Sequence, residues 1–239
     1  MAEAQAGSAG KVVEQGSFVE VDYTLRVKET GELVDTTLEE VAKEAVMEAG
    51  AAVFEPRLTV VGRGMLLRAI EEEMVGMRED ESKTFEIPPE RAFGQRDPSK
   101  VRVIPLRRLR DLDQPIAVGT RLIIDGKECV VRSISSGRVQ VDFNHHLAGK
   151  TLVCDLRVRR IITDDLEKVY ALLHSRIPEV NRGNTQVSLE DGKVVVRFPK
   201  EVYLISGIQL VKRALAREIL EHLKGVTRVV FVEEWDASI

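Results

Sequence analysis

A block of sequence from Pro98 to Phe143 reads as a small β domain that interrupts a longer pattern. Its apolar residues come in short runs, with hairpin-type turn residues between them. The turns are Gly119, Asp125-Gly126 and Ser136-Gly137. The strings AFGQRD, residues 92–97, and NHHLAGKTL, residues 144–152, flank the block and read as the two ends of one domain. The chain is therefore expected to hold a discontinuous domain with an insertion.

The sequence around the block predicts strands and short helices. From Phe18 to Val27 apolar and polar residues alternate, which predicts a half-buried strand with Tyr23 on its apolar face. Asp35-Thr36-Thr37 is expected to cap a helix over Leu38–Glu48. Residues 65–74 show helical spacing, with Glu71, Glu72 and Glu73 expected to point outward. Alternation returns at 83–87 and 152–158, so the whole is predicted to be an α+β domain.

The sequence after Thr163 predicts a third, compact α+β domain. A helix at 166–173 is followed by two strands around Asp191-Gly192, a longer helix at 208–219 and a last strand at 226–232. A unit of this size buries its apolar surface poorly alone, which favours self-association. We therefore expect a homodimer formed through this domain.

Composition excludes several classes of function. The 239 residues include 39 acidic and 35 basic side chains, and the net charge of −4 gives no general case for nucleic acid or an anionic membrane as a partner. Residues 1–15 are expected to be flexible, and no apolar run has the length of a signal peptide or a membrane span. A cytoplasmic protein is predicted, with Cys129 and Cys154 as buried free thiols.

Two clusters could suggest binding sites but are interpreted otherwise. His145 and His146 are neighbours that would point to opposite faces of an extended segment, so no shared metal is expected. Arg107, Arg108 and Arg110 are followed by acidic residues and lack aromatic neighbours, which favours a solvated edge over an RNA contact.

Taken together, the two flanking strings and the inserted block resemble the SlyD-like branch of FKBP-type peptidyl-prolyl cis-trans isomerases, in its long archaeal type. The resemblance covers roughly residues 16–162. It implies an FKBP-like antiparallel sheet wrapped on a short helix at 16–97 and 144–162, a mostly β insert-in-flap chaperone domain at 98–143, and a small α+β C-terminal domain at 163–239. It implies X-Pro isomerisation in unfolded or partly folded polypeptides that contain proline.

The reaction has modest chemical demands. Rotation about an amide costs about 18 to 20 kcal/mol because resonance is lost, and X-Pro bonds turn over in tens of seconds. A dry apolar pocket favours the twisted amide, which is less polar than the planar one. No nucleophile, metal or cofactor is needed, so none is expected.

The resemblance also implies the pocket residues. Tyr23 matches the pocket tyrosine of the family, and Asp35 matches its pocket carboxylate. Leu66 and Leu67 match the aliphatic pair that precedes the pocket helix. The resemblance implies that the Leu67 N–H donates a hydrogen bond to the substrate. The remaining matches are Ile70 at the pocket floor, Phe93 in the Ala-Tyr/Phe-Gly signature, Leu147 as a wall and Cys154. Phe93 lacks the usual hydroxyl, and Cys154 replaces a phenylalanine, so altered ligand affinity is expected.

Alternatives follow from the same residues. Taken singly, Tyr23 and Phe93 suit an apolar core, and Asp35 suits a helix cap. The departures at Phe93 and Cys154 would also fit a holdase chaperone with little isomerase activity. A further alternative makes the C-terminal domain an RNA-binding or ribosome-docking module, although acidic residues are interspersed among its basic ones. Its basic residues are Lys200, Lys212, Arg213 and Arg217.

Overall fold

The computed structural model describes residues 11–45, 54–109 and 115–235. The chain divides into two compact units. One unit comprises Met1–Thr24, Asp35–Thr84 and Asp155–Ile239, and the other comprises Leu25–Val34 and Phe85–Cys154. The division passes through long strands and does not follow the ends of the inserted block. Of the N-terminus expected to be flexible, residues 1–10 lie outside the described residues.

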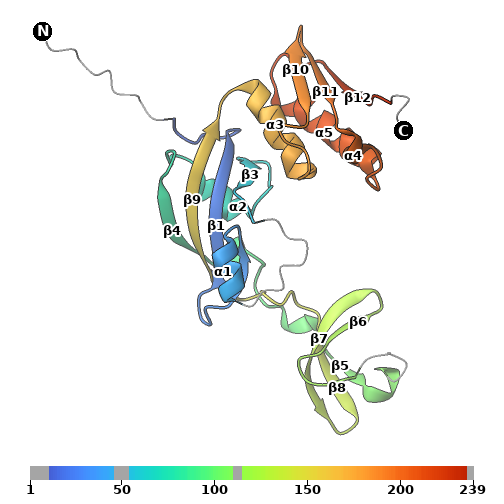
Figure 1. Cartoon of the computed structure of the whole chain (residues 1–239). Coiled ribbons are helices and arrows are strands. Elements are labelled where there is room, and N and C mark those ends of the chain that lie inside the picture. The colour runs from blue at the N-terminus through green and yellow to red at the C-terminus, as the bar shows by residue number, and fades with distance from the viewer. Residues whose placement is uncertain (1–10, 46–53, 110–114, 236–239) are drawn as a thin grey trace, which may run out of the picture. The chain divides into compact units, whose positions relative to one another are not determined.

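The first sheet has the strand order β2-β1-β9-β4, and β3 pairs with β1 in antiparallel register (Figure 1). Its strands are β1 (Phe18–Val27), β2 (Leu33–Thr36), β3 (Arg57–Val60), β4 (Ser82–Ile87) and β9 (Leu152–Ile162). The helices in this part of the chain are α1 (Glu39–Glu44) and α2 (Arg68–Met74). Mixed strands and short helices confirm the predicted α+β fold class.

The predicted cap of the first helix is wrong. The residue that precedes α1 is Leu38, which makes no capping bond through its side chain. Asp35 and Thr36 belong to β2, where strand pairing fixes their backbone. The nearest substitute for a cap is Thr36 Oγ1, which accepts from the Leu38 N–H at 3.1 Å. The expected helical residues 46–48 lie outside the described part of the chain.

Strand β1 is more deeply buried on one face than on the other, as expected for a half-buried strand. Val19, Val21 and Tyr23 lie on one face as predicted, with 3% or less of each exposed. On the other face Glu20, Asp22 and Arg26 are partly exposed, whereas Phe18 is 2% exposed and Thr24 is 6% exposed. Phe18 is covered because it packs into a core built largely from the C-terminal part of the chain.

That core joins β1 and β3 to the C-terminal elements within the same unit. Phe18, Leu58 and Val60 belong to one cluster with Val169 and Leu215. The C-terminal elements are α3 (Asp165–Arg176), β10 (Gln186–Glu190), β11 (Lys193–Arg197), α4 (Lys200–Tyr203), α5 (Ile208–His222) and β12 (Arg228–Val232). The C-terminal sequence therefore contributes to the burial of the first sheet.

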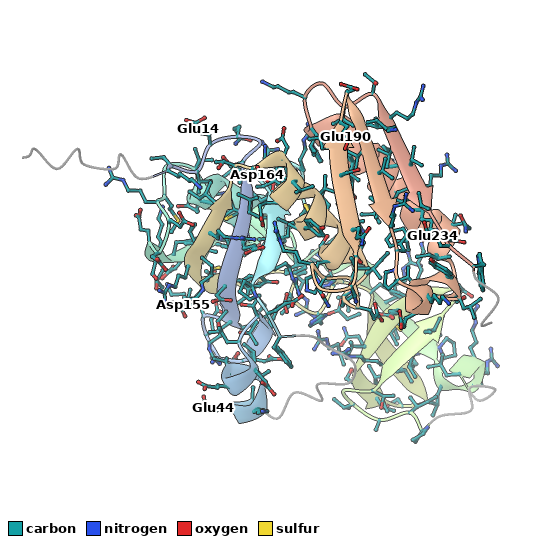
Figure 2. All side chains as sticks on the ribbon, turned by 45° about the horizontal axis from the view of Figure 1, so that its top comes forward. Glu14, Glu44, Asp155, Asp164, Glu190 and Glu234 are labelled. Atoms are coloured by element: carbon teal, nitrogen blue, oxygen red, sulfur yellow. The ribbon has the colours of Figure 1, made fainter. Side chains whose placement is uncertain are left out.

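The C-terminal elements form a sheet with helices packed against it. The order is β10-β11-β12, with an antiparallel hairpin at Asp191-Gly192, as predicted, and a parallel β11–β12 pair. Helices α3 and α5 contact each other and the sheet (Figure 1). Asp164, labelled in Figure 2, begins α3 by accepting the Glu167 N–H at 2.9 Å.

The inserted block forms a separate sheet with the order β5-β8-β7-β6. Its strands are β5 (Val101–Pro105), β6 (Arg121–Ile124), β7 (Lys127–Ser135) and β8 (Arg138–Asp142). Short 3₁₀ helices lie at Pro89–Arg91, Pro98–Lys100 and Leu106–Leu109. A buried cluster lies under this sheet and consists of Leu109, Leu122, Cys129, Val131, Val139 and Val141. The prediction of a mostly β insertion with its own apolar core is confirmed.

Two further sequence expectations can be compared with the structure. Cys129 and Cys154 are both buried, as predicted, and neither forms a disulfide bond. Among the described residues, no helix is both long enough and apolar enough to cross a membrane.

The Asp191-Gly192 hairpin yields a test of the C-terminal sheet. Gly192 has φ +71°, and an added Cβ would lie 2.6 Å from the Gly225 carbonyl oxygen. Gly192→Ala should therefore destabilise this region by about 2 kcal/mol or more, because it adds a backbone collision to the strain of a left-handed alanine. The measurement is urea unfolding followed by the fluorescence of Trp235, which packs on Tyr203.

Gly207→Ala is the matched control. Gly207 has a similar φ of +77° but open space around its Cβ position. It should cost only the conformational strain, about 1 kcal/mol. Equal midpoints for the two variants would contradict the predicted collision.

Candidate active site

Tyr23, Asp35 and Arg57 form a hydrogen-bonded group. The Tyr23 hydroxyl donates to Asp35 Oδ2 at 2.5 Å, and Arg57 Nη1 donates to the Tyr23 oxygen at 2.5 Å. Arg57 Nη1 also lies 3.3 Å from Asp35 Oδ2. The guanidinium carbon is 5.4 Å from the centroid of the tyrosine ring, within cation–π range. The phenol, the carboxylate and the guanidinium thus hold one another in place.

Strand pairing explains why these residues meet. Arg57 opens β3 and is opposite Val21 on β1, so its side chain can reach Tyr23 two residues further along. The Tyr23 N–H donates to Thr37 Oγ1 at 3.0 Å, which holds the end of β2 against β1. Asp35 Oδ1 accepts the Thr36 N–H at 2.9 Å. Asp35 therefore binds the tyrosine hydroxyl and a backbone N–H of its own strand, and it does not cap a helix.

The residues around α2 lie in the same unit as Tyr23. Ile70 is 1% exposed, whereas Leu66 and Leu67 are half-buried. Leu67 immediately precedes α2, and its N–H donates to none of the described residues. A free N–H at the start of a helix can donate to a bound carbonyl group.

Glu71 is buried, which corrects the expectation that it points outward. Its side chain accepts three backbone N–H groups, from Gly62 at 2.8 Å, Gly64 at 3.0 Å and Leu66 at 3.0 Å. Only 2% of the residue is exposed. The helical pattern of apolar residues could not reveal this role, because the three donors belong to the preceding turn. Glu71 fixes the turn that presents Leu66 and Leu67.

Phe93 and Leu147 belong to the other unit, where His145 links them. The Phe93 and His145 rings stack with centroids 4.4 Å apart and an interplanar angle of 2°. His145 Nδ1 accepts the Leu147 N–H at 3.3 Å, and Leu147 is 4% exposed. Cys154 is fully buried on β9 of this unit. Each predicted site residue is thus placed, in two groups that belong to different units.

His145 and His146 do not point apart, contrary to the sequence expectation. Their ring centroids are 4.5 Å apart, because a turn begins here and the backbone is not extended. Partial burial and the positive charge of His146 lower the pKa of His145, against the charge of Glu128. In the described part of the chain, no three His, Cys, Asp or Glu side chains gather as metal ligands.

A buried carboxylate ties the ends of the insertion together. Asp142 accepts from Arg96 at 2.6 Å, Arg132 at 3.1 Å and the Asn144 amide at 2.7 Å. Burial opposes its charge, yet hydrogen bonds from Asn144 and Arg132 and the charge of Arg96 lower the pKa of Asp142. Asn144 in turn accepts the Asp97 N–H at 2.9 Å. The two flanking strings of the sequence therefore contact each other through Asp97 and Asn144.

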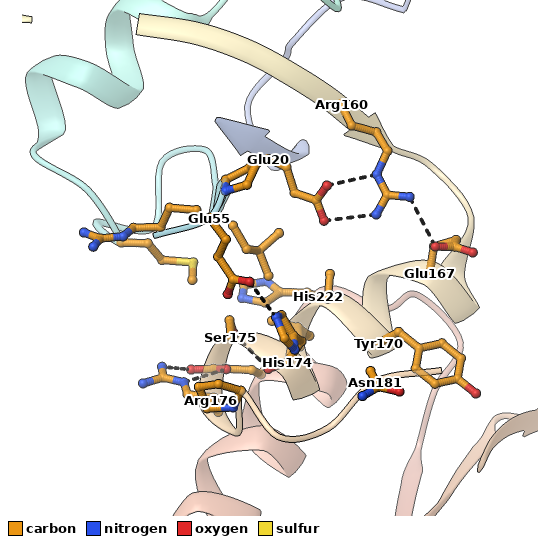
Figure 3. Close-up of a pocket in the computed structure, with 18 of the residues that line it drawn as sticks. Glu20, Glu55, Arg160, Glu167, Tyr170, His174, Ser175, Arg176, Asn181 and His222 are labelled. Carbon is orange, nitrogen blue, oxygen red and sulfur yellow. Dashed lines mark hydrogen bonds and ion pairs between the residues drawn. The ribbon is translucent and has the colours of Figure 1, made fainter. Parts of the chain in front are cut away.

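A cavity of about 1290 Å³ lies between β3 and the helices α3 and α5 (Figure 3). Its lining is strongly charged and includes Glu55, Arg63, Arg160, His174 and Glu218. Arg57 also lines it, but Tyr23 and Asp35 do not. Its charged lining does not match the dry apolar surface that amide rotation requires.

The chain was compared with known families and proteins. A model described as FKBP-type peptidyl-prolyl cis-trans isomerase matches residues 10–107. A short-type peptidyl-prolyl cis-trans isomerase of Methanocaldococcus jannaschii is 36% identical over 150 residues, which cover 63% of this chain and 94% of that protein. The chain belongs to the FKBP-type peptidyl-prolyl cis-trans isomerase family. It is a peptidyl-prolyl cis-trans isomerase of the long, archaeal SlyD-like type.

The other matches agree with this type of FKBP. Models described as the FKBP26 IF domain and the FKBP26 C-terminal match residues 102–147 and 165–236. SlyD of Treponema pallidum is 32% identical over 153 residues, covering 62% of this chain and 78% of that protein. A probable FKBP-type 16 kDa isomerase of Pseudomonas fluorescens is 32% identical over 149 residues, covering 60% and 88%.

The role of Glu71 predicts a specific local effect. Glu71→Gln would place a side-chain amide among three backbone donors, so hydrogen bonds from Gly62, Gly64 or Leu66 should be lost at about 1 to 3 kcal/mol. Faster hydrogen exchange at these amides is expected. Glu72→Gln is the control, because Glu72 is exposed on the same helix and pairs with exposed Arg68. Unchanged exchange in Glu71→Gln would contradict the assignment.

Proposed function

We propose that this FKBP combines X-Pro isomerisation at the Tyr23–Asp35 group with capture of client chains by its inserted sheet. The clients would be unfolded or partly folded polypeptides that contain proline. The isomerase step would take place against Tyr23, Ile70, Phe93, Leu147 and Cys154, the apolar residues that the family resemblance assigns to the pocket. Asp35 and the Leu67 N–H would hold the peptide in register, and no cofactor would be required.

The Tyr23 side chain does more than fill space in the core. Its hydroxyl has two charged partners, because it donates to Asp35 and accepts from Arg57. The two charged partners are about half exposed, so a peptide can reach them from solvent. This arrangement supports a polar edge beside an apolar surface, which suits a chain that carries both a proline ring and amide groups.

Exposed apolar side chains on the inserted sheet carry the client-binding proposal. Val103 on β5 is 60% exposed, and Ile123 on β6 is 61% exposed. Both belong to edge strands of this sheet, with β8 and β7 between them. Edge strands offer unpaired backbone groups, and extended peptides can add to them. The buried cluster of the block is separate, so these residues are not needed to fill its core.

We further propose self-association through the C-terminal part of the chain. Leu204 is 84% exposed, Leu210 is 73% exposed and Trp235 is 54% exposed. Apolar side chains of this size favour burial against a second copy. An RNA-contact role is less well supported here, since Lys212 is only 7% exposed and pairs with Glu233.

A cytoplasmic location is part of the proposal. The pKa of Cys129 is raised by burial, and further by the charge of Asp142, so this group stays a neutral thiol. Buried thiols that form no disulfide bond suit a reducing compartment.

The isomerase assignment predicts a selective effect at Tyr23. Tyr23→Phe should lower kcat/KM for a short proline peptide about 5- to 50-fold, because the link between Asp35 and the ring is lost while the apolar surface remains. The assay is proline isomerisation coupled to peptide cleavage. Tyr170→Phe is the matched control, since its hydroxyl bonds the Thr185 carbonyl oxygen and the Val187 N–H instead. Equal activities of the two variants would count against the assignment.

The client-binding proposal is tested in the full-length chain. The double variant Val103→Ser and Ile123→Ser should slow catalysed, proline-limited refolding of a protein about 10-fold, with short-peptide activity unchanged, because tethered capture raises the local concentration of prolines. Val12→Ser removes an apolar side chain, 40% exposed, outside the insertion and serves as the control. Client protection with no peptide activity in the parent chain would instead establish a holdase.

A further inference from the structure

His174 of α3 contacts the segment that leads into β3. His174 Nε2 lies 3.0 Å from Glu55 Oε2, and its Nδ1 lies 2.8 Å from the Val180 carbonyl oxygen. Figure 3 shows this contact between the imidazole and Glu55, both of which line the cavity described above. Pro56 and Arg57 follow Glu55 directly, and β3 begins at Arg57. The contact therefore lies two residues from the guanidinium that holds Tyr23 and Asp35.

The geometry of His174 requires a particular protonation state. A carbonyl oxygen can only accept, so Nδ1 must carry a proton. Nε2 faces a carboxylate, which also only accepts, so this nitrogen must carry a proton as well. Only the imidazolium satisfies both contacts. Burial works against this charge, but the hydrogen bonds of Glu55 and Val180 and the charges of Glu55 and Glu20 raise the pKa of His174 from 6.5.

The backbone at the start of β3 is restrained, so it cannot adjust freely when Glu55 shifts. Pro56 fixes its own backbone angle, and Arg57 is paired with Val21 of β1. Leu58 is 6% exposed in the core that includes Leu172 of α3. A shift of Glu55 is therefore transmitted to Arg57 by a stiff, short segment that is anchored on its far side.

We infer that His174 is a positioning residue for the isomerase reaction, which acts by holding Glu55 and thereby placing the Arg57 guanidinium on Tyr23 and Asp35. The inference rests on the proposed role of the Tyr23–Asp35 group. It gives the C-terminal part of the chain a role in catalysis besides self-association. The contact is intact while His174 is charged, and it is lost as pH rises through the raised pKa of His174.

The other charged groups around His174 are already paired with one another. Arg160 of β9 binds Glu20 of β1 and Glu167 of α3, and Arg63 binds Glu221 of α5. On α3 itself, Arg176 binds Glu218 of α5, and Arg182 pairs with Glu167. Two further groups line the cavity, Arg217 and His222. Burial lowers the pKa of His222, with the charge of Arg63 adding to this. Its titration therefore lies below that of His174.

The test follows activity and structure together across pH. Wild-type kcat/KM for a short proline peptide should fall about 3- to 10-fold as pH rises through the pKa of His174, with the loss mainly in kcat. His174→Ala should show the lower, high-pH value of kcat/KM at every pH. Glu55→Gln should give a flat profile, because a neutral amide no longer distinguishes imidazolium from imidazole. Arg176→Gln, which breaks a different pair on the same helix, should keep the wild-type profile.

NMR separates failure of this inference from failure of the proposed function. The Arg57 side-chain N–H resonance should shift with the titration of the His174 ring in the wild type and in Arg176→Gln, but not in Glu55→Gln. The inference would be overturned if the Arg57 signal did not follow the titration of His174. It would also be overturned if His222→Gln alone abolished the pH dependence of kcat/KM. A coupled Arg57 signal without peptide activity at any pH would support the positioning contact while refuting the isomerase role of this group.

Discussion

The burial of β1 is the constraint on which the rest of the structure depends. One face carries Val21 and Tyr23, and the other carries Phe18 into a core with α3 and α5. A one-residue shift of this strand would turn Glu20 and Asp22 toward the core that now holds Val21 and Tyr23. This fixes the register of β3, which supplies Arg57. The geometry of the Tyr23–Asp35–Arg57 group therefore depends partly on residues at the far end of the chain.

Buried carboxylates organise the turns in both units. Glu71 gathers three N–H groups before α2, and Asp142 gathers Arg96, Arg132 and Asn144 at the ends of the insertion. A carboxylate accepts several donors at once, so one buried side chain can replace the backbone pairing that an irregular turn lacks. The irregular segments before α2 and at the ends of the insertion are thus held in place by hydrogen bonds to a single side chain in each case.

Local sequence patterns predicted the positions of strands and turns better than they predicted the burial and the partners of individual side chains. Alternation correctly indicated β1, and the Asp191-Gly192 turn correctly indicated the β10–β11 hairpin. The same patterns failed where a distant partner decided the outcome. Glu71 looked like a solvated residue, His145 and His146 were expected to point apart, and Arg57 was not singled out at all. No local signal identifies Arg57, because its partner Tyr23 is 34 residues away.

The sequence by itself determined the family, the α+β class and the order of the parts, because strand alternation, turn residues and the two flanking strings are local properties. Through the family resemblance, it also predicted that Tyr23 and Asp35 belong to one pocket. The tertiary structure alone decided that Arg57 binds both, that Glu71 is buried, and that His174 contacts Glu55. These depend on strand register and on a core shared by segments far apart in the chain. Such long-range contacts leave no periodicity in the sequence.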